Sequence, residues 1–452
     1  MTFFSKDQTF YKRLFTILLT VSLQNIVAYS VNMADNLMLG SYSQVTLSGA
    51  ATVNQIFFII QQLSVAICDA VVIIGSQYWG KRNVASLRKV GGCGLKLSIG
   101  GGILTWLICF MFPGQLIALF TPDEAIASEG MAYMSLIKYT FILFLITQTI
   151  LATLRCADTV RIAFIVSCIS LLVNVGANYC LIFGKFGAPE LGIRGAAIGT
   201  LIARIVELLI VLFYAIKIDH KIQIFRGNPF KSDKNISHDF YVLASRVLMQ
   251  DLLWALSIPL QSAILGHLSS DAIAANSIAT TFYQYLKVIV RAMASASTVM
   301  IGTAIGRGNM GEVKAEARTL SLLDLLLGLV LGLALYLLHK PLLSLYSLTD
   351  SAYVMADQLL ILMAVLMVFM SYMMPVMNGI LRGGGDANFT LWLNMISTWA
   401  VVVPLSFISA FVWKLPVVWV VFFSQCDQIY KTPIVLWRFC GYKWMKQLTR
   451  DN

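Results

Sequence analysis

Long uncharged apolar runs recur along the whole chain, and they limit what it can fold into. The first begins after Arg13 and reaches Gly40, and about twenty of its residues pass before a charge appears, which is the length of helix needed to cross a bilayer's hydrocarbon core. Hydrophobic residues make up 58% of the chain and charged residues only 12%, whereas soluble domains have about 25% charged residues. The chain is therefore an integral membrane protein.

Apolar windows of spanning length occur in every part of the chain. Set against a hydrocarbon core of about 30 Å, they predict an all-α integral membrane protein with twelve transmembrane helices. The opening run exceeds the roughly 7 to 15 residues of a signal-peptide core and lacks a small-residue cleavage site, so we expect it to remain as the first helix. The predicted helices span 14–35, 49–75, 91–112, 131–154, 162–183, 193–216, 240–265, 272–303, 319–338, 353–381, 389–411 and 415–437.

Positive charge is concentrated in alternate loops of this map. The two termini and the loops after the even-numbered helices hold about 23 of the 33 Lys and Arg residues, and the opposite loops hold about five. Because cytoplasmic loops carry such an excess, we expect a multi-pass protein of the plasma (inner) membrane with both termini in the cytoplasm. The net charge of +11 reflects these loops, and no nucleic-acid partner is expected.

The two halves of the chain repeat one pattern at an offset of about 226 residues. Leu39-Gly40 returns as Leu265-Gly266, and the stretch 150–158 is echoed by 378–386, which is one residue longer before its acid. Equivalent helices differ by six, an even number, so the halves are parallel repeats about an axis along the membrane normal, as in many transporters. A gene duplication with no role in transport would leave the same pattern.

The repeat divides the chain into two lobes. It predicts an N-terminal six-helix lobe at 1–216 and a C-terminal six-helix lobe at 239–452, related by a pseudo-two-fold axis. The polar stretch 217–238 is expected to join them as a cytoplasmic loop.

Several glycine motifs predict packing or turns. Gly195-x-x-x-Gly199 and Gly328-x-x-x-Gly332 are typical of helices that approach closely. Residues 306–311 fit G-x-G-x-x-G, but they follow a membrane helix and not a strand, so a dinucleotide site is not expected.

Motifs of enzymes and ATP-driven pumps are missing from the sequence. The eight cysteines form no C-x-x-C pair, and the four histidines lack the spacing of metal ligands. There is no P-loop and no nucleophile elbow. We therefore expect no enzyme, no cofactor and no metal beyond a sodium ion.

A few charged residues fall within or at the ends of the apolar runs. Asp35 is costly at the edge of hydrocarbon unless it binds a cation or a proton, or caps an exposed helix end. Lys287 and Arg291 lie one helical turn apart and need anionic partners, for which Asp251, Asp324 and Asp69 are candidates. Asp427 and Lys431 have the same spacing and opposite charge, which favours a buried ion pair.

An ordered set of motifs resembles the multidrug and toxic compound extrusion (MATE) family over nearly the whole chain. The resemblance implies two six-helix lobes around a central cavity and the export of organic cations or drugs in exchange for protons or sodium ions. The motifs are at 34–40, 154–159, 181–184, 191–197, 250–254, 379–386 and 431–444.

The resemblance also implies where the cation is bound. The family's N-lobe site corresponds here to Asp35, Asn174, Asn178 and Thr200, whose carboxylate, amide and hydroxyl oxygens suit H⁺ or Na⁺, and the other coupling acid corresponds to Asp251. Three features depart from the family pattern. Asn178 stands where many relatives have a second acid, Ser371 stands where some have an acid in helix 10, and no proline occurs between Leu14 and Gly40.

Aromatic, thioether and amide side chains suit loose recognition of a small organic substrate. Because Lys287 and Arg291 would repel cations, anionic and zwitterionic substrates are alternatives to cationic ones.

We predict a monomeric antiporter that exports amphipathic compounds in exchange for H⁺ or Na⁺. A flippase for membrane lipid or lipid-linked sugar, from the same superfamily, is the alternative. The candidate cavity residues are Tyr29, Gln55, Phe58, Gln61, Gln261, Phe282, Tyr283, Tyr285 and Met377.

Overall fold

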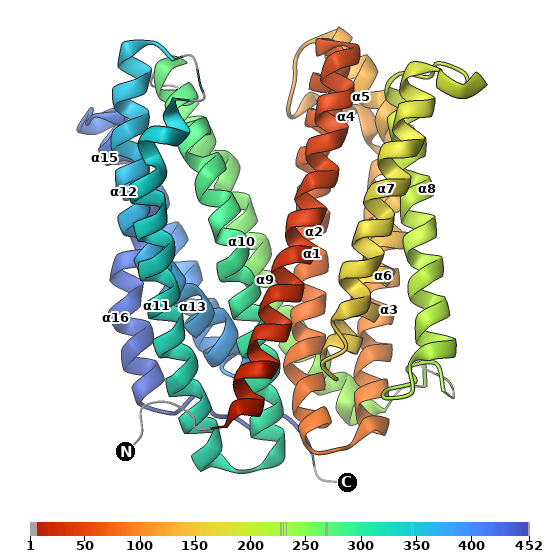
Figure 1. Ribbon diagram of the computed structural model, residues 1–452, viewed down its shortest axis with the longest axis vertical. Helices are drawn as coiled ribbons and strands as arrows, with labels where there is room; N and C mark the ends of the chain where they lie inside the picture. Colours follow the sequence, from red (N-terminus) through yellow and green to blue (C-terminus); the bar gives the residue numbers. More distant parts are fainter. Residues whose placement is uncertain are drawn as a thin grey trace. The chain divides into compact units, whose positions relative to one another are not determined.

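The structure is a computed structural model, and in the part of the chain that it describes every regular element is a helix (Figure 1). This confirms the predicted all-α fold class. The structure describes residues 7–450 apart from 227, 229, 232, 267–269, 345 and 347.

The chain divides into two compact units. The N-terminal unit is Leu23–Ala244, and the C-terminal unit is Ser245–Asn452 together with Met1–Ser22. Helices α1 and α9 therefore each contribute residues to both units. The predicted lobe limits at 216 and 239 stay a prediction, and residues 227, 229 and 232 of the predicted loop lie outside the described residues.

The N-terminal unit is built from long helices that run side by side (Figure 1). Short turns join them; the turn before α3 ends at Asn83, whose side chain caps the helix by accepting a hydrogen bond from the Ser86 N–H at 3.0 Å. The elements are α1 (Gln8–Tyr42), α2 (Gln44–Gly80), α3 (Val84–Met111), α4 (Pro113–Ala118), α5 (Glu124–Ile137), α6 (Thr140–Arg155), α7 (Arg161–Phe183), η1 (Lys185–Gly187), α8 (Ile193–Phe213) and η2 (Tyr214–Ile218).

The C-terminal unit has the same style of packing, with several wider π-helical turns. One of them begins at Pro375, which has no N–H to donate to the preceding turn. The elements are α9 (Lys234–Gly266), α10 (Ser270–Arg307), α11 (Met310–Leu343), α12 (Asp350–Met374), η3 (Pro375–Leu381), α13 (Ala387–Ile396), η4 (Ser397–Val402), α14 (Val403–Phe407), η5 (Ile408–Val412), α15 (Val417–Gln425) and α16 (Asp427–Cys440).

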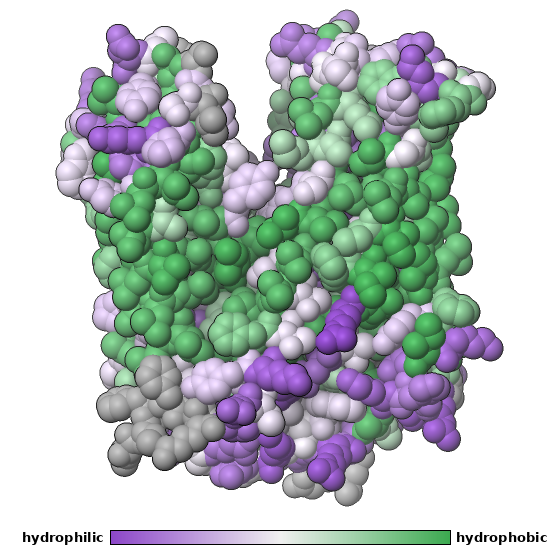
Figure 2. Space-filling view, in the orientation of Figure 1, coloured by the Kyte–Doolittle hydropathy of each residue, from purple (hydrophilic) through white to green (hydrophobic). Residues whose placement is uncertain are grey.

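Ten helices among the described residues are long and apolar enough to cross a membrane, and counting one bent pair gives eleven. The bent pair is α5 and α6, and the chain bends by 51° between them. A single helix at 131–154 was predicted here. The twelfth predicted helix, at 415–437, falls on α15 and α16, which have only 9 and 14 residues. In each unit an apolar belt separates two polar ends (Figure 2), as expected of a multi-pass membrane protein.

Both G-x-x-x-G motifs lie where two helices approach closely, which confirms their predicted packing role. A methyl group on Gly195 of α8 would overlap the Leu181 carbonyl of α7, and one on Gly328 of α11 would come within 2.9 Å of the Val368 carbonyl of α12. Only a residue without a side chain lets these backbones meet.

The turn after α6 has the same backbone geometry as the turn after η3. In the first, the N–H of Asp158 donates to the Arg155 carbonyl at 3.0 Å, and in the second the N–H of Gly385 donates to the Arg382 carbonyl at 3.0 Å. Asp158 (φ 57°) and Gly385 (φ 96°) are both left-handed. Asp158 is thus structurally equivalent to Gly385, and the acid of the second turn, Asp386, lies one residue further on.

Candidate functional site

The Asp35 carboxylate lies inside the N-terminal unit and is bound by an amide. Asp35 projects from α1 and is only 9% exposed. Its Oδ1 accepts a hydrogen bond from Nδ2 of Asn178 on α7 at 2.5 Å. Because α1 continues to Tyr42, Asp35 does not cap a helix end, and the capping interpretation is wrong.

The predicted polar cluster is assembled across three helices. Asn174 and Asn178 are one turn apart on α7 and fully buried. Nδ2 of Asn178 also lies 3.4 Å from Oδ1 of Asn174, and Nδ2 of Asn174 donates to the Thr200 hydroxyl of α8 at 3.3 Å. A continuous polar chain therefore runs from Asp35 through α7 to α8.

One oxygen of this cluster has no hydrogen-bond partner among the residues that the structure describes. Oδ1 of Asn178 is buried and accepts no hydrogen bond. It lies against Gly199 of α8, where any Cβ atom would overlap it. A buried polar atom without a partner costs about 1–3 kcal/mol, so the cluster has unused capacity to bind a cation or a hydroxyl proton. Within the described residues no three His, Cys, Asp or Glu side chains group as a metal site.

An ion pair on α8 belongs to the same unit but was missed by the sequence reasoning. Nη1 of Arg204 lies 2.6 Å from Oε2 of Glu207, which is 3% exposed. The guanidinium also lies 4.9 Å from the centre of the Phe144 ring. The signal was available, because an arginine and a glutamate three residues apart interrupt the apolar run 193–216.

Asp251 of α9 forms an ion pair in the C-terminal unit. Its Oδ1 lies 3.2 Å from Nη1 of Arg382, a side chain that is 4% exposed. The neighbouring Gln250 donates to Asn378 at 3.2 Å and accepts from the Thr390 hydroxyl at 3.1 Å. Asp251 is thus fixed to the turn after η3.

The charged residues of α16 form an ion pair with each other, whereas Lys287 of α10 lies near an aromatic ring. Nζ of Lys431 lies 2.7 Å from Oδ2 of Asp427, which confirms the predicted ion pair, and 2.7 Å from Oδ1 of Asn394. Lys287 lies with its ammonium 5.7 Å from the centre of the Trp254 ring. Arg291 is half-buried on the next turn of α10.

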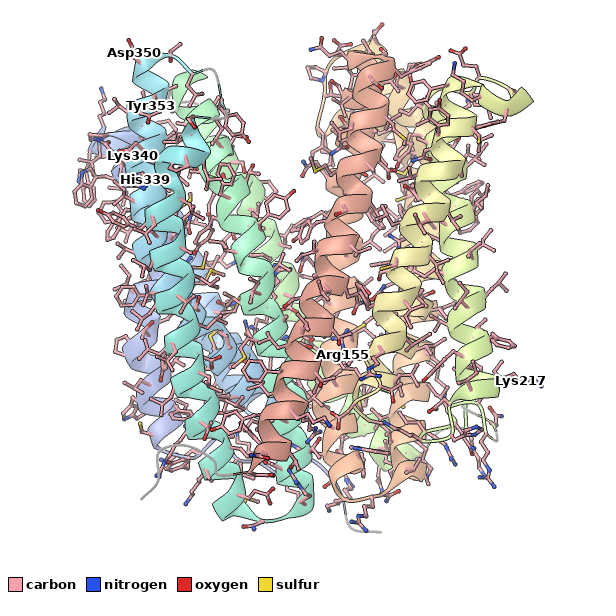
Figure 3. All side chains as sticks on the ribbon, viewed as in Figure 1. Arg155, Lys217, His339, Lys340, Asp350 and Tyr353 are labelled. Carbon is pink, nitrogen blue, oxygen red and sulfur yellow. The ribbon has the colours of Figure 1, made fainter. Side chains whose placement is uncertain are left out.

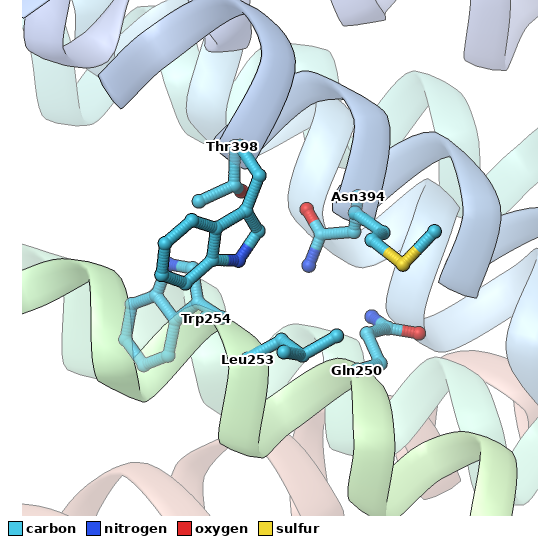
Figure 4. A pocket seen from close by; sticks show the side chains of 7 residues that line it. Gln250, Leu253, Trp254, Asn394 and Thr398 are labelled. Carbon is cyan, nitrogen blue, oxygen red and sulfur yellow. The ribbon is translucent and has the colours of Figure 1, made fainter. Parts of the chain in front are cut away.

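A small pocket in the C-terminal unit is lined by Trp254 and Asn394, the residues that Lys287 and Lys431 contact. Gln250, Leu253 and Trp254 of α9 face Asn394 and Thr398 across it (Figure 4). None of the predicted substrate residues lines this pocket.

The sequence model of the MatE family matches residues 21–180 and 248–408, most of the chain. The chain belongs to the MatE family. A probable multidrug resistance protein NorM of Thermotoga maritima is 26% identical over 447 residues, which covers 98% of this chain and 95% of the relative.

Solved MATE structures have the same fold. A mutant of the Vibrio cholerae MATE transporter VcmN matches with a TM-score of 0.87 at 17% identity, covering 97% of this chain and 98% of that one. A MOP superfamily transporter of Pyrococcus furiosus matches with a TM-score of 0.84 at 16% identity, covering 96% and 97%. As a MatE member, the chain is a multi-pass membrane transporter.

The cavity residues predicted from the MATE resemblance differ in exposure. Tyr29 and Tyr285 are 39% and 46% exposed, so both are open to a ligand or to lipid. Tyr283 and Met377 are buried. The Tyr283 hydroxyl donates to Oε1 of Gln428 at 2.9 Å, so it is a core residue in this conformation. Gln55 is exposed, and Phe58, Gln61, Gln261 and Phe282 are partly buried.

Proposed function

We propose that this MatE member is a secondary antiporter that exports amphipathic organic compounds from the cytoplasm in exchange for H⁺ or Na⁺. The observation that carries the proposal is the buried Asp35 carboxylate with Asn178, Asn174 and Thr200 chained behind it. A carboxylate inside a membrane protein is costly unless it binds a cation or a proton. The name of a multidrug resistance protein for its Thermotoga relative supports drug-like substrates.

The orientation of the Asn178 amide should depend on whether Asp35 is ionised or has bound a cation. In the structure the NH₂ group faces the carboxylate, which suits an ionised acid that only accepts hydrogen bonds. A sodium ion needs oxygen ligands, and a protonated acid offers an O–H. Either cation therefore favours a reversed amide with Oδ1 turned towards Asp35. That reversal changes the contact with Gly199 and so connects cation binding to the packing of α7 against α8.

Cation binding drives export only through a difference in affinity between conformations. We propose that entry of H⁺ or Na⁺ loads Asp35 in the outward-open state and lowers the affinity for substrate there. Asp251 is the second candidate coupling residue. Protonation of Asp251 would remove the charge that holds Arg382 and release the turn after η3.

The proposal includes the topology predicted from the sequence. A monomer in the plasma (inner) membrane has both termini in the cytoplasm, with lobes at 1–216 and 239–452 and an inner loop at 217–238. Arg155 and Lys217 support it, because both lie towards the same end of the N-terminal unit (Figure 3) and positive loops face the cytoplasm.

Gradient-driven efflux from proteoliposomes tests the proposal. Imposed inward proton and sodium gradients are applied separately to vesicles loaded with a fluorescent organic dye. We expect one of them to drive efflux in the wild type and neither to do so in Asp35→Asn. Glu124→Gln, which removes an exposed acid of the same unit, is the matched control and should transport normally. Wild-type efflux that ignores both gradients would overturn the coupling, and full activity of Asp35→Asn would remove Asp35 from it.

A lipid or lipid-linked sugar flippase is the second candidate function. Lys287 and Arg291 favour it, because Asp427 is already paired with Lys431 and two cations on adjacent turns suit a phosphate group. In vesicles with a fluorescent phospholipid, the double variant Lys287→Gln/Arg291→Gln should lose lipid translocation while Lys340→Gln keeps it. Wild-type vesicles that translocate no lipid would exclude this function.

A further inference from the structure

Asp324 is a carboxylate that the proposed coupling does not use. It lies in the middle of α11 with none of its surface exposed. In the part of the chain that the structure describes, neither carboxylate oxygen has a hydrogen-bond partner. It therefore does not serve as the anionic partner considered above for Lys287 and Arg291.

Hydroxyl groups gather on the facing surfaces of α11 and α12. One turn before Asp324, the Ser321 hydroxyl donates to the Tyr372 hydroxyl of α12 at 3.2 Å. The Ser371 hydroxyl is also buried and has no hydrogen-bond partner within the described ranges. One turn after Asp324, Gly328 brings the helices together, since a methyl group there would come within 3.0 Å of the Ser371 Cβ. The helices thus lie close together here, and among the described residues hydroxyl groups but no hydrogen-bonded cation accompany the acid.

No charged group of the packed helices that the structure describes forms a hydrogen bond with Asp324. On α10, Lys287 lies over Trp254, and Arg307 pairs with Glu312 and Glu316 of α11 at 3.0 and 3.2 Å. Arg291 of α10 makes no ion pair with Asp324. On α11 itself, Arg318 donates to the Tyr442 hydroxyl at 2.8 Å and the Lys314 ammonium lies 4.9 Å from the centre of the same ring. His339 and Lys340 lie at the far end of α11 (Figure 3), where His339 pairs with Asp357 of α12 at 3.3 Å. Asp350 begins α12, Tyr372 of α12 carries a phenol, and η3 has no titratable side chain.

An ionised carboxylate in this position would be a buried charge without any counter-ion, the most costly arrangement for such a group. The neutral acid avoids that cost. We infer that Asp324 holds a proton in this conformation and is a second proton-binding site, in the C-terminal unit and separate from the Asp35 cluster. Opening of the seam between α11 and α12 to water releases the proton. The inference that this proton is taken up and released during transport rests on the proposed antiport function.

Infrared spectroscopy of the full-length protein in lipid tests the bound proton without any transport. The carbonyl stretching band of a protonated carboxylic acid should be present at neutral pH in the wild type and in Asp35→Asn, and should lose one group's intensity in Asp324→Asn. Because asparagine mimics the neutral acid in shape, Asp324→Asn should fold with an unchanged melting temperature. A wild-type minus Asp324→Asn difference spectrum showing an ionised carboxylate would overturn the inference. Loss of the protonated band on adding NaCl would do the same, since it would assign the site to sodium.

Proton counting tests whether the site takes part in transport. In lightly buffered proteoliposomes with a pH-sensitive dye, Asp324→Asn should move one proton fewer per substrate than the wild type. An unchanged ratio would show a static proton and overturn the transport role. Asp35→Asn separates this outcome from failure of the proposed function, because full efflux by that variant would remove the Asp35 coupling and leave the infrared assignment of Asp324 intact.

Discussion

Nδ2 of Asn178 lies 2.5 Å from Oδ1 of Asp35 and joins α7 to α1 inside the N-terminal unit. Asn178 also has a buried oxygen without a partner, pressed against Gly199 of α8. The one amide thus contacts the acid through its nitrogen and the neighbouring helix through its oxygen. Changes on either side of it should alter cation binding.

Replacing Asn178 by a second acid beside Asp35 should strengthen sodium binding. Asn178→Asp places two carboxylates side by side, and a cation between them relieves their repulsion. We expect about tenfold tighter sodium binding, or ~1.4 kcal/mol, seen as a larger rise in melting temperature with NaCl than in the wild type. Choline chloride at equal ionic strength controls for screening. Identical NaCl and choline responses in the variant would contradict the cation site.

Filling the space at Gly199 should disturb the cluster. Gly199→Ala forces a methyl group onto Oδ1 of Asn178, and we expect a loss of roughly 1–3 kcal/mol in the free energy of unfolding, as for other overpacked cores. Gly176→Ala on α7 is the matched control, since a Cβ there meets open space. That control should be stabilised by about 0.4–1 kcal/mol. Equal melting temperatures for the two variants would show that the close approach has no energetic effect.

Removing the partner of Asp251 should be strongly destabilising. Arg382→Gln removes the cation that lies 3.2 Å from this mostly buried carboxylate, and breaking such a pair costs about 3–5 kcal/mol. The double variant Asp251→Asn/Arg382→Gln removes both charges and should recover most of the loss. Chemical unfolding in detergent measures each variant. If the single variant is as stable as the double one, the pair contributes nothing.

One surface ion pair should give a stability difference that depends on pH. The hydrogen bond from Lys89, with a backbone bond from Ile236, lowers the pKa of Asp233 below its usual value of 3.8. A lowered pKa in the folded state adds stability that is present above the unfolded pKa and is lost as the pH falls through the folded pKa. Asp233→Asn should therefore melt below the wild type at pH 6, and the gap should narrow as the pH falls below 3.8. A gap that stays constant over this range would contradict the pairing.

The class of protein, most of the membrane spans and the family could be predicted from the amino-acid sequence. These predictions depend on local patterns, such as apolar runs of bilayer length and the spacing of Gly195 and Gly199. Such patterns can be recognised without knowing how the helices pack. The spacing of Asn174 and Asn178 likewise fixed that both amides share one face of α7. That Asp35 meets them was implied only by the family resemblance.

The pairing of the buried charges could be learned only from the packed helices. The packing pairs Asp251 with Arg382 and Arg204 with Glu207, and among the described residues it gives Asp324 no hydrogen-bond partner. It also bent the span at 131–154 into α5 and α6. Packing is needed because the cost of a buried charge depends on groups far away in sequence, which come within a few ångströms only when the helices pack. The length of the apolar runs places the chain in a membrane, and helix packing determines which carboxylates gain a partner.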